Sequence, residues 1–175
     1  TAFDTIAVSG KASSLPHGEP RNVQLEKGFL TMDYGAKIDG YCSDMTRTIV
    51  IGKADAEIKK LYDTVLRAQL AGLEAIKEGA DCTLCDKAAR DIITEAGYGE
   101  YFGHGTGHGV GIEIHEEPNL SPRSEAVFKA GHIVTVEPGI YLPGKFGVRI
   151  EDMLFFYPDK VVDITKTAKE LIEIY

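Results

Sequence analysis

Histidine and glycine are concentrated in one short segment of this chain. His104, His108 and His115, three of the five histidines, lie in a run with glycine at positions 103, 105, 107, 109 and 111. Glycine allows the backbone to approach other groups closely and leaves neighbouring imidazoles unshielded. A single histidine is usually structural, whereas three in a glycine run favour a site where imidazole binds a metal ion or transfers a proton.

The glycine run also loosely imitates a dinucleotide-binding loop. Such a loop must open a helix, so that the helix N-terminus meets the phosphates. Residues 112–115 instead alternate like a strand, and Pro118 is expected to end that strand. This context argues against phosphate binding.

Acidic residues are the second group whose spacing suggests chemistry. Residues that face each other across an antiparallel hairpin point to the same side of the sheet. Asp33 and Asp44 can face each other in this way if the hairpin is centred between Ile38 and Asp39. A two-residue Asp39-Gly40 turn would move that centre by one residue, so the direct pairing requires a bulge or a wider loop.

Glu137 and Glu151 repeat this arrangement across a hairpin centred on Gly144. Like charges directly opposite one another are destabilising, so two such pairs require counterions. Four carboxylates and an imidazole suit hard or borderline divalent ions such as manganese, cobalt or zinc. Two divalent ions would balance the four acidic charges, and one would not.

The composition indicates a globular protein that has neither nucleic acid nor a membrane as its partner. Its 175 residues are 43% hydrophobic, which suffices for the core of one domain. A net charge of -8 repels phosphate backbones and anionic lipid, and no apolar run approaches the roughly 18 residues of a transmembrane helix. Three cysteines fit a reducing compartment, so we expect a cytoplasmic protein in which Cys82 and Cys85 are structural.

Two amphipathic helices are predicted in the middle of the chain. Apolar residues recur at helical spacing over residues 54–78, and Gly79 is expected to stop this helix. The second helix begins with Thr83 as its N-cap and Asp86 three residues later, and it ends before Gly97.

Strands are predicted on both sides of these helices. β-Branched and aromatic residues mark residues 29–34, 41–51, 132–137 and 148–157. Turn-forming segments join the first two and the last two, so each pair is predicted to form a hairpin. The two hairpin segments share an order of glycine, apolar strand, acid, turn, strand and acid, which is a weak internal repeat. The sequence therefore predicts an α+β domain with two related hairpins.

Seven segments carry a closer likeness: Leu15-Pro-His17-Gly, Met32-Asp33-Tyr-Gly, Ser43-Asp44-Met-Thr-Arg-Thr48, Gly105-Thr-Gly-His108-Gly-Val-Gly, Ile114-His115-Glu-Glu-Pro118, Thr135-Val-Glu137-Pro-Gly-Ile-Tyr141 and Val148-Arg-Ile-Glu151-Asp. In this order they resemble the Xaa-Pro aminopeptidase and prolidase family, over nearly the whole chain. The resemblance implies the pita-bread fold, an α+β catalytic domain with two pseudo-symmetric halves around a dinuclear metal site. It implies that residues 1–175 are this domain, truncated before Thr1 and without the separate N-terminal domain that helps to form the oligomer.

The resemblance also implies roles for individual residues. The five metal ligands would be Asp33, which chelates one ion, Asp44 and Glu151, which bridge both, and His108 and Glu137, which complete the second. The substrate-side residues would be His17, His104 and His115, which orient the scissile carbonyl and assist proton transfer, and Arg149, which binds a carboxylate of either a metal ligand or the substrate. Manganese is the expected metal, with cobalt or zinc as alternatives, and a bridging hydroxide is the expected nucleophile.

The function implied is a metal-dependent exopeptidase, an aminopeptidase or a dipeptidase, that hydrolyses the bond before a proline in second position. Its partners would be peptide substrates and, in the full-length protein, further copies of itself. One alternative is a methionine aminopeptidase-like enzyme, which the Val-Arg-Ile-Glu context of Arg149 and the Glu-Glu-Pro that follows His115 disfavour. The other is a pita-bread binding module without catalysis, or a fragment inert through truncation; all five expected ligands are present, which argues against lost catalysis.

Overall fold

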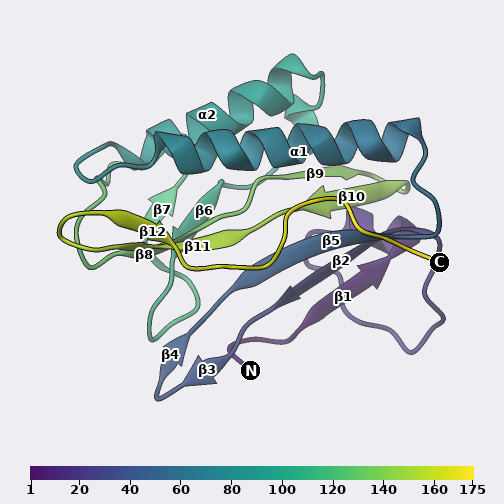
Figure 1. The fold of residues 1–175 in the computed structure, drawn as a ribbon, viewed down its shortest axis with the longest axis horizontal. Helices are drawn as coiled ribbons and strands as arrows, with labels where there is room; N and C mark the ends of the chain where they lie inside the picture. The colour runs from purple at the N-terminus through teal and green to yellow at the C-terminus, as the bar shows by residue number, and fades with distance from the viewer.

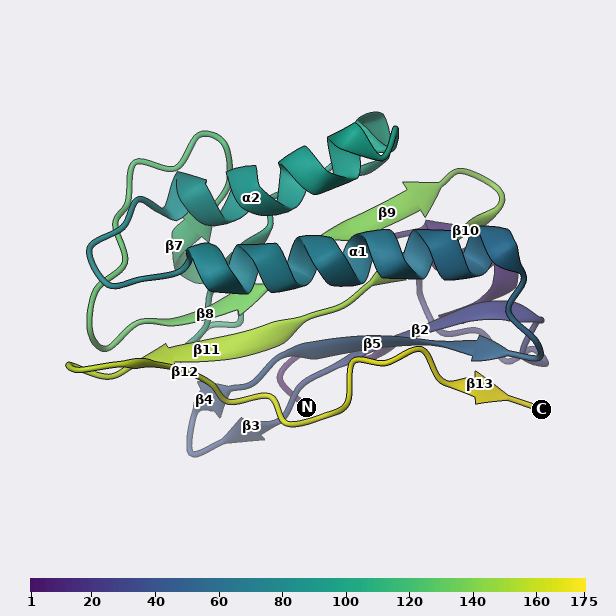
Figure 2. The same ribbon diagram turned by 45° about the horizontal axis from the view of Figure 1, so that its top comes forward.

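Two α-helices lie together over one face of a β-layer. The computed structural model describes all of residues 1–175 and shows α1 at Ala56–Ala75 and α2 at Cys82–Glu95, packed side by side above the strands (Figures 1 and 2). Two short 3-10 helices are η1 (Gly10–Ser14) and η2 (Gly99–Tyr101). The expected mixture of helices and sheet is therefore confirmed.

The strands form two main sheets and two short ribbons. The first sheet has the order β1-β2-β5-β13, the second β12-β11-β8-β6-β7, and the ribbons pair β3 with β4 and β9 with β10. Neighbouring strands are antiparallel, except that β13 runs parallel to β5. The bounds are β1 Ile6–Ser9, β2 Gly28–Tyr34, β3 Lys37–Ile38, β4 Tyr41–Cys42, β5 Met45–Ile51, β6 Gly107–Gly109, β7 Glu116–Leu120, β8 Ile133–Val136, β9 Gly139–Leu142, β10 Phe146–Arg149, β11 Asp152–Phe156, β12 Val161–Asp163 and β13 Glu173–Ile174.

Both predicted hairpins are present, one in each sheet. β2 pairs with β5 in the first sheet and β8 pairs with β11 in the second. The long strands predicted for residues 41–51 and 148–157 are each interrupted, giving β4 and β5 in one and β10 and β11 in the other. These interruptions matter for function, because acidic residues lie in them.

The ends of the helices differ in part from expectation. The side chain of Asp55 accepts a hydrogen bond of 2.8 Å from the Ile58 N–H, which caps α1. α2 starts at Cys82, so the prediction of Thr83 as its N-cap is wrong: Thr83 lies inside the first turn. Asp86 is consequently not a capping residue, and it is buried. Gly97 follows the end of α2 with a φ of +88°, as its position predicts.

The core fills the space between the helices and the sheets. Leu61 and Val65 of α1 are fully buried in one cluster with Phe29 of β2 and Ile140 of β9. A second cluster contains both Cys82 and Cys85 together with β8 and β11 side chains. Burial raises the pKa of the Cys82 thiol to about 11, which keeps it protonated and agrees with a structural role. Neither helix is long and apolar enough to cross a membrane.

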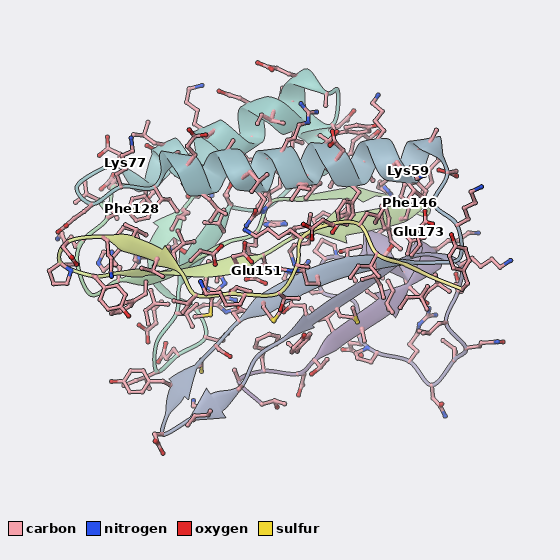
Figure 3. All side chains as sticks on the ribbon, in the orientation of Figure 1. Lys59, Lys77, Phe128, Phe146, Glu151 and Glu173 are labelled. Carbon is pink, nitrogen blue, oxygen red and sulfur yellow. The ribbon has the colours of Figure 1, made fainter.

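A segment near the C-terminus is fixed to the back of β11. Arg47 of β5 donates to the carbonyls of Thr167 at 2.8 Å and Ala168 at 3.0 Å, and also to the carboxylate of Asp152 at 2.7 Å. Asp152 is fully buried, and it also pairs with Lys169. The same guanidinium donates to the carbonyl of Glu151 at 2.5 Å. Glu151 itself lies in the middle of the molecule, whereas the labelled lysines lie towards its ends (Figure 3).

Candidate metal centre

The nine residues predicted for the site all line one pocket of about 920 Å³. Five were predicted as metal ligands, namely Asp33, Asp44, His108, Glu137 and Glu151. Four were predicted on the substrate side, namely His17, His104, His115 and Arg149. The fold thus brings together residues that are more than 130 positions apart in the chain.

The first hairpin delivers its two acids in a different register from the one predicted. Asp33 pairs with Thr46, not with Asp44. The reason is the turn: Asp39 and Gly40 have φ values of +50° and +90° and form a two-residue turn. That turn sets the register of the whole hairpin, and Asp44 falls in the interruption between β4 and β5.

The second hairpin has the predicted register. Val136 pairs with Asp152, so the next positions in that register place Glu137 opposite Glu151. Gly144 lies at the centre of the connecting turn with a φ of +71°. Both glutamates lie where the ladder is interrupted, between β8 and β9 on one side and between β10 and β11 on the other.

The glycine run forms β6, between β8 and β7. A Cβ atom on Gly107 would stand 2.0 Å from the Thr135 carbonyl oxygen, and one on Gly109 would stand 2.4 Å from that of Glu117. Glycine is therefore required for this strand to approach both neighbours. The run opens a strand and not a helix, which agrees with the argument against phosphate binding.

The strand predicted for residues 112–115 is wrong. Residues 111–115 form bends, and β7 begins at Glu116 with Pro118 inside it. The Gly111 N–H donates to the Glu113 carbonyl at 3.0 Å, and the Glu113 N–H donates to the Glu116 carboxylate at 2.9 Å. These local hydrogen bonds replace a strand ladder and leave His115 exposed at the pocket.

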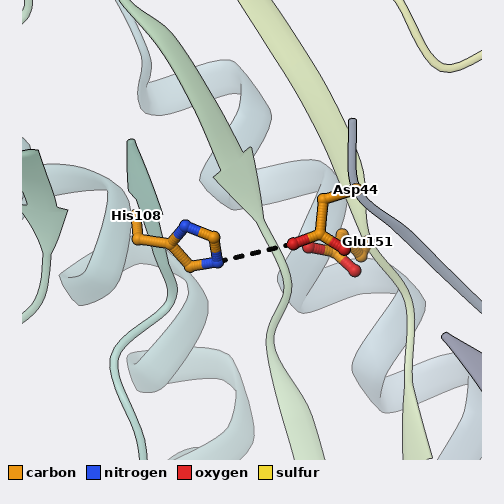
Figure 4. Close-up of side chains that lie close together, drawn as sticks. All are labelled: Asp44, His108 and Glu151. Atoms are coloured by element: carbon orange, nitrogen blue, oxygen red, sulfur yellow. Dashed lines mark ion pairs between the residues drawn. The ribbon is translucent and has the colours of Figure 1, made fainter. Parts of the chain in front are cut away.

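The His108 ring directs its Nε2 atom towards the acids. Its Nδ1 lies 2.9 Å from the carbonyl oxygen of Gly109, which can only accept, so Nδ1 carries the proton. The other nitrogen, Nε2, lies 3.2 Å from Glu137 Oε1. It also lies 3.7 Å from Asp44 Oδ2, along the dashed line in Figure 4. This arrangement, in which a backbone carbonyl fixes the tautomer, is typical of metal-binding histidines.

Burial and mutual repulsion disturb the titration of the acids. The pKa of Asp44 is raised to about 8, by burial and then by the charges of Asp33 and Glu137. Burial and the charges of the neighbouring acids raise the pKa of Glu151 well above its ordinary range. Burial also raises the pKa of Asp33. Glu137 is the exception: burial opposes its ionisation, but the hydrogen bond and charge of His108 keep its pKa low.

The donor set fits a divalent cation. Ligand atoms of Asp44, His108 and Glu151 lie within 4.8 Å of one another (Figure 4). The Oδ1 atoms of Asp33 and Asp44 are buried and have no hydrogen-bond partner. Buried polar atoms without a partner are rare in folded proteins, and a cation would satisfy both.

Arg149 binds a carboxylate of the cluster. Its Nη2 donates to Asp33 Oδ2 at 2.6 Å, and its Nη1 donates to the Tyr141 hydroxyl at 2.8 Å. Its Nε donates to the Thr46 hydroxyl at 3.0 Å, and its side chain is only 4% exposed. Arg149 therefore contacts the carboxylate of a predicted metal ligand, Asp33.

The three substrate-side histidines differ in how firmly other residues hold their rings. His104 is held by the protein, because its Nδ1 donates to Gly105 O at 2.7 Å and its Nε2 lies 3.0 Å from the Tyr141 hydroxyl. His115 and His17 are exposed at the pocket, and the ring of His115 lies 4.4 Å from that of His108. Burial lowers the pKa of both His104 and His115, so both are neutral at pH 7 and each can offer a hydrogen bond.

Arg123 also lines the pocket, and the sequence patterns did not predict it there. It is exposed, lies in the loop after β7, and makes no ion pair within the chain. The available signal was a cation in the polar loop 121–125 of an acidic chain. Loop residues have no periodicity, so this signal is weak.

Comparison with known proteins identifies the family. The model of metallopeptidase family M24 matches residues 1–156. The chain belongs to metallopeptidase family M24. A protein of Bacillus subtilis named uncharacterized peptidase YqhT is 48% identical over 98% of the chain, and the Xaa-Pro dipeptidase of Pyrococcus furiosus is 47% identical over 98%. The solved structure of Xaa-Pro dipeptidase from Bacillus anthracis covers 99% of the chain at 52% identity with a TM-score of 0.95.

The likeness to this solved structure, and to that of a dipeptidase from Pyrococcus horikoshii with a TM-score of 0.95 at 45% identity, confirms the pita-bread fold that the motifs implied. The chain covers 49% of each of the two sequence relatives and 49% of the solved chain, about half of their length. Members of this family use divalent metal ions, which agrees with the cluster described above.

Proposed function

We propose that residues 1–175 form the catalytic domain of a metal-dependent exopeptidase that hydrolyses the peptide bond before a proline in second position. The observation that carries the proposal is the largely buried cluster of four acids and His108, with two unpartnered carboxylate oxygens, in the lining of one large pocket. The names of the relatives, Xaa-Pro dipeptidases, favour the proline branch over the methionine branch.

Two divalent ions are the proposed cofactors, manganese first and cobalt or zinc as alternatives. Asp33, Asp44, His108, Glu137 and Glu151 would hold them. Bound ions of this kind lower the pKa of water and polarise a carbonyl oxygen. Because burial and repulsion raise the pKa of Asp44 and Glu151, binding displaces protons and becomes tighter as the pH rises.

The remaining residues of the pocket orient the substrate. His17 and His115 are exposed at the pocket, where their rings would hydrogen-bond the peptide carbonyl and pass a proton to the leaving nitrogen. Arg149 acts on the site through Asp33, whose carboxylate it holds in place. His104 is fixed by Gly105 and Tyr141 and forms part of the wall.

Selection for proline would depend on shape and on the charge at the pocket mouth. An Xaa-Pro bond is a tertiary amide without an N–H, so the pocket cannot select it by accepting a hydrogen bond. Arg123 is exposed and unpaired, and we propose that it binds the terminal carboxylate of a short substrate. A role for Arg123 would favour dipeptides over longer peptides. We further propose a cytoplasmic homo-oligomer.

The test is hydrolysis by the protein that contains this chain, loaded with Mn²⁺. Xaa-Pro dipeptides should be cleaved well, and the matched Xaa-Ala dipeptides should be rejected. Glu151→Gln should reduce turnover by orders of magnitude. Equal cleavage of both substrates, or a preference for N-terminal methionine whatever follows it, would overturn the proposed specificity.

A further inference from the structure

Asp86 is a buried acid that the proposed reaction does not use. It lies on α2, is only 1% exposed, and is at some distance in sequence from every predicted site residue. Arg90, one helical turn later, donates to both of its oxygens, from Nε and Nη2, each at 2.8 Å. A two-pronged pair of this kind fixes the orientation of both side chains.

Arg90 also holds the segment that leads into the glycine run. Its Nη1 donates to the Phe102 carbonyl at 2.9 Å, and its Nη2 donates to the His104 carbonyl at 2.7 Å. The guanidinium carbon lies 4.1 Å from the centre of the Phe102 ring. One side chain therefore binds this segment at two carbonyls and one aromatic face.

Asp86 binds the same segment two residues further on. Its Oδ1 accepts from the Thr106 hydroxyl at 2.9 Å and from the Thr106 N–H at 3.1 Å. Thr106 is fully buried, and its carbonyl accepts the N–H of Glu137 at 2.7 Å. Thr106, which α2 holds through Asp86, therefore directly precedes β6, the strand that carries His108. It is also joined to Glu137 by a backbone hydrogen bond.

We propose that Asp86 and Arg90, which we call the α2 clamp, are positioning residues that hold His108 and Glu137 in their metal-binding geometry. This rests on the metal site proposed above. Glycines at 103, 105 and 107 give the segment more conformational freedom than any other residue type would. The α2 clamp removes that freedom by binding the residues between these glycines. Groups that orient metal ligands in this way typically change metal affinity by 10- to 100-fold.

Paired substitutions at Thr106 test the clamp with little change of shape. Thr106→Val keeps the volume of the side chain but removes the hydroxyl that donates a hydrogen bond to Asp86. Thr106→Ser keeps that hydroxyl. We expect Thr106→Val to weaken Mn²⁺ binding about fivefold or more, and Thr106→Ser to bind within about twofold of wild type, by calorimetric titration of metal-free protein. Circular dichroism confirms that each variant is folded.

Arg90→Lys is the second variant, because one ammonium cannot hold Asp86 and two carbonyls together. We expect about tenfold weaker Mn²⁺ binding. Its matched control is Arg67→Lys on α1, where Arg67 pairs with Asp63 at the same helical spacing but in solvent. That control should bind Mn²⁺ as wild type does.

These measurements test the α2 clamp and the metal site separately. Wild-type affinity in Thr106→Val or in Arg90→Lys would overturn the clamp, and so would equal loss of affinity in Thr106→Val and Thr106→Ser. Absence of Mn²⁺ binding by the wild type would instead overturn the metal site itself.

Discussion

Replacing Asp44 by asparagine should make the metal-free protein more stable, although it removes a proposed metal ligand. In the folded protein, burial and neighbouring acids raise the pKa of Asp44 from 3.8 to about 8. That difference corresponds to at most about 6 kcal/mol of unfavourable free energy for the ionised carboxylate. Asparagine has a similar shape and no charge, so the variant avoids this cost at every pH.

The assay is urea unfolding at pH 8 in EDTA and, separately, with Mn²⁺ at saturation. In EDTA we expect Asp44→Asn to have a free energy of unfolding at least about 2 kcal/mol above that of wild type, because relaxation of the site removes only part of the repulsion. With Mn²⁺ the order should reverse, since only the wild type binds the ion fully. Asp63→Asn, an exposed acid on α1, is the charge-matched control and should change stability by less than about 0.5 kcal/mol. Equal or lower stability of Asp44→Asn in EDTA would refute the claim that these acids repel one another in the metal-free fold.

Three further predictions concern pH, backbone space and proton transfer. The stability advantage of Asp44→Asn in EDTA should be absent near pH 4 and grow towards pH 8, because the folded wild type keeps a proton that the unfolded chain releases near its ordinary pKa of 3.8; an advantage that is constant across a urea-unfolding pH series would contradict this. Gly107→Ala should abolish Mn²⁺ binding and lower the Tm, since its Cβ would collide with the Thr135 carbonyl, whereas Gly103→Ala, with open space around it, should change neither in calorimetry. His115→Ala should retain metal, measured by elemental analysis, and lower kcat against Xaa-Pro substrates, while His132→Ala, outside the pocket, should lower neither; loss of metal from His115→Ala would exclude its proposed role.

The sequence predicts the second hairpin better than the first for a physical reason. In the second hairpin, Gly144 takes the central turn position with a positive φ. A turn centred on Gly144 fixes the register in which Glu137 lies opposite Glu151. In the first hairpin two registers compete, and Asp39-Gly40 forms the tight turn that pairs Asp33 with Thr46.

Tertiary contacts account for the other differences. Thr83 and Asp86 have the spacing of a capping box. In the structure, however, the carboxylate of Asp86 accepts hydrogen bonds from the N–H and the hydroxyl of Thr106 and does not cap the helix. Residues 111–115 alternate like a strand, yet local hydrogen bonds to Glu113 and Glu116 bend them. A hydrophobic pattern describes one face of one element, and it carries no information on which distant backbone group will need a partner.

The contacts of Arg47 set the order in which the site can be completed during synthesis. Its guanidinium supports the carbonyl of Glu151 and depends on the carbonyls of Thr167 and Ala168 for two of its donors. A chain leaves the ribosome from its N-terminus, so both hairpins emerge before residues 167 and 168 do. Both hairpins can therefore pair while the support behind Glu151 is still missing, and that support forms only after residue 168 has emerged. The proposed peptidase would thus stay incomplete among other nascent proteins until nearly all of this domain has left the ribosome.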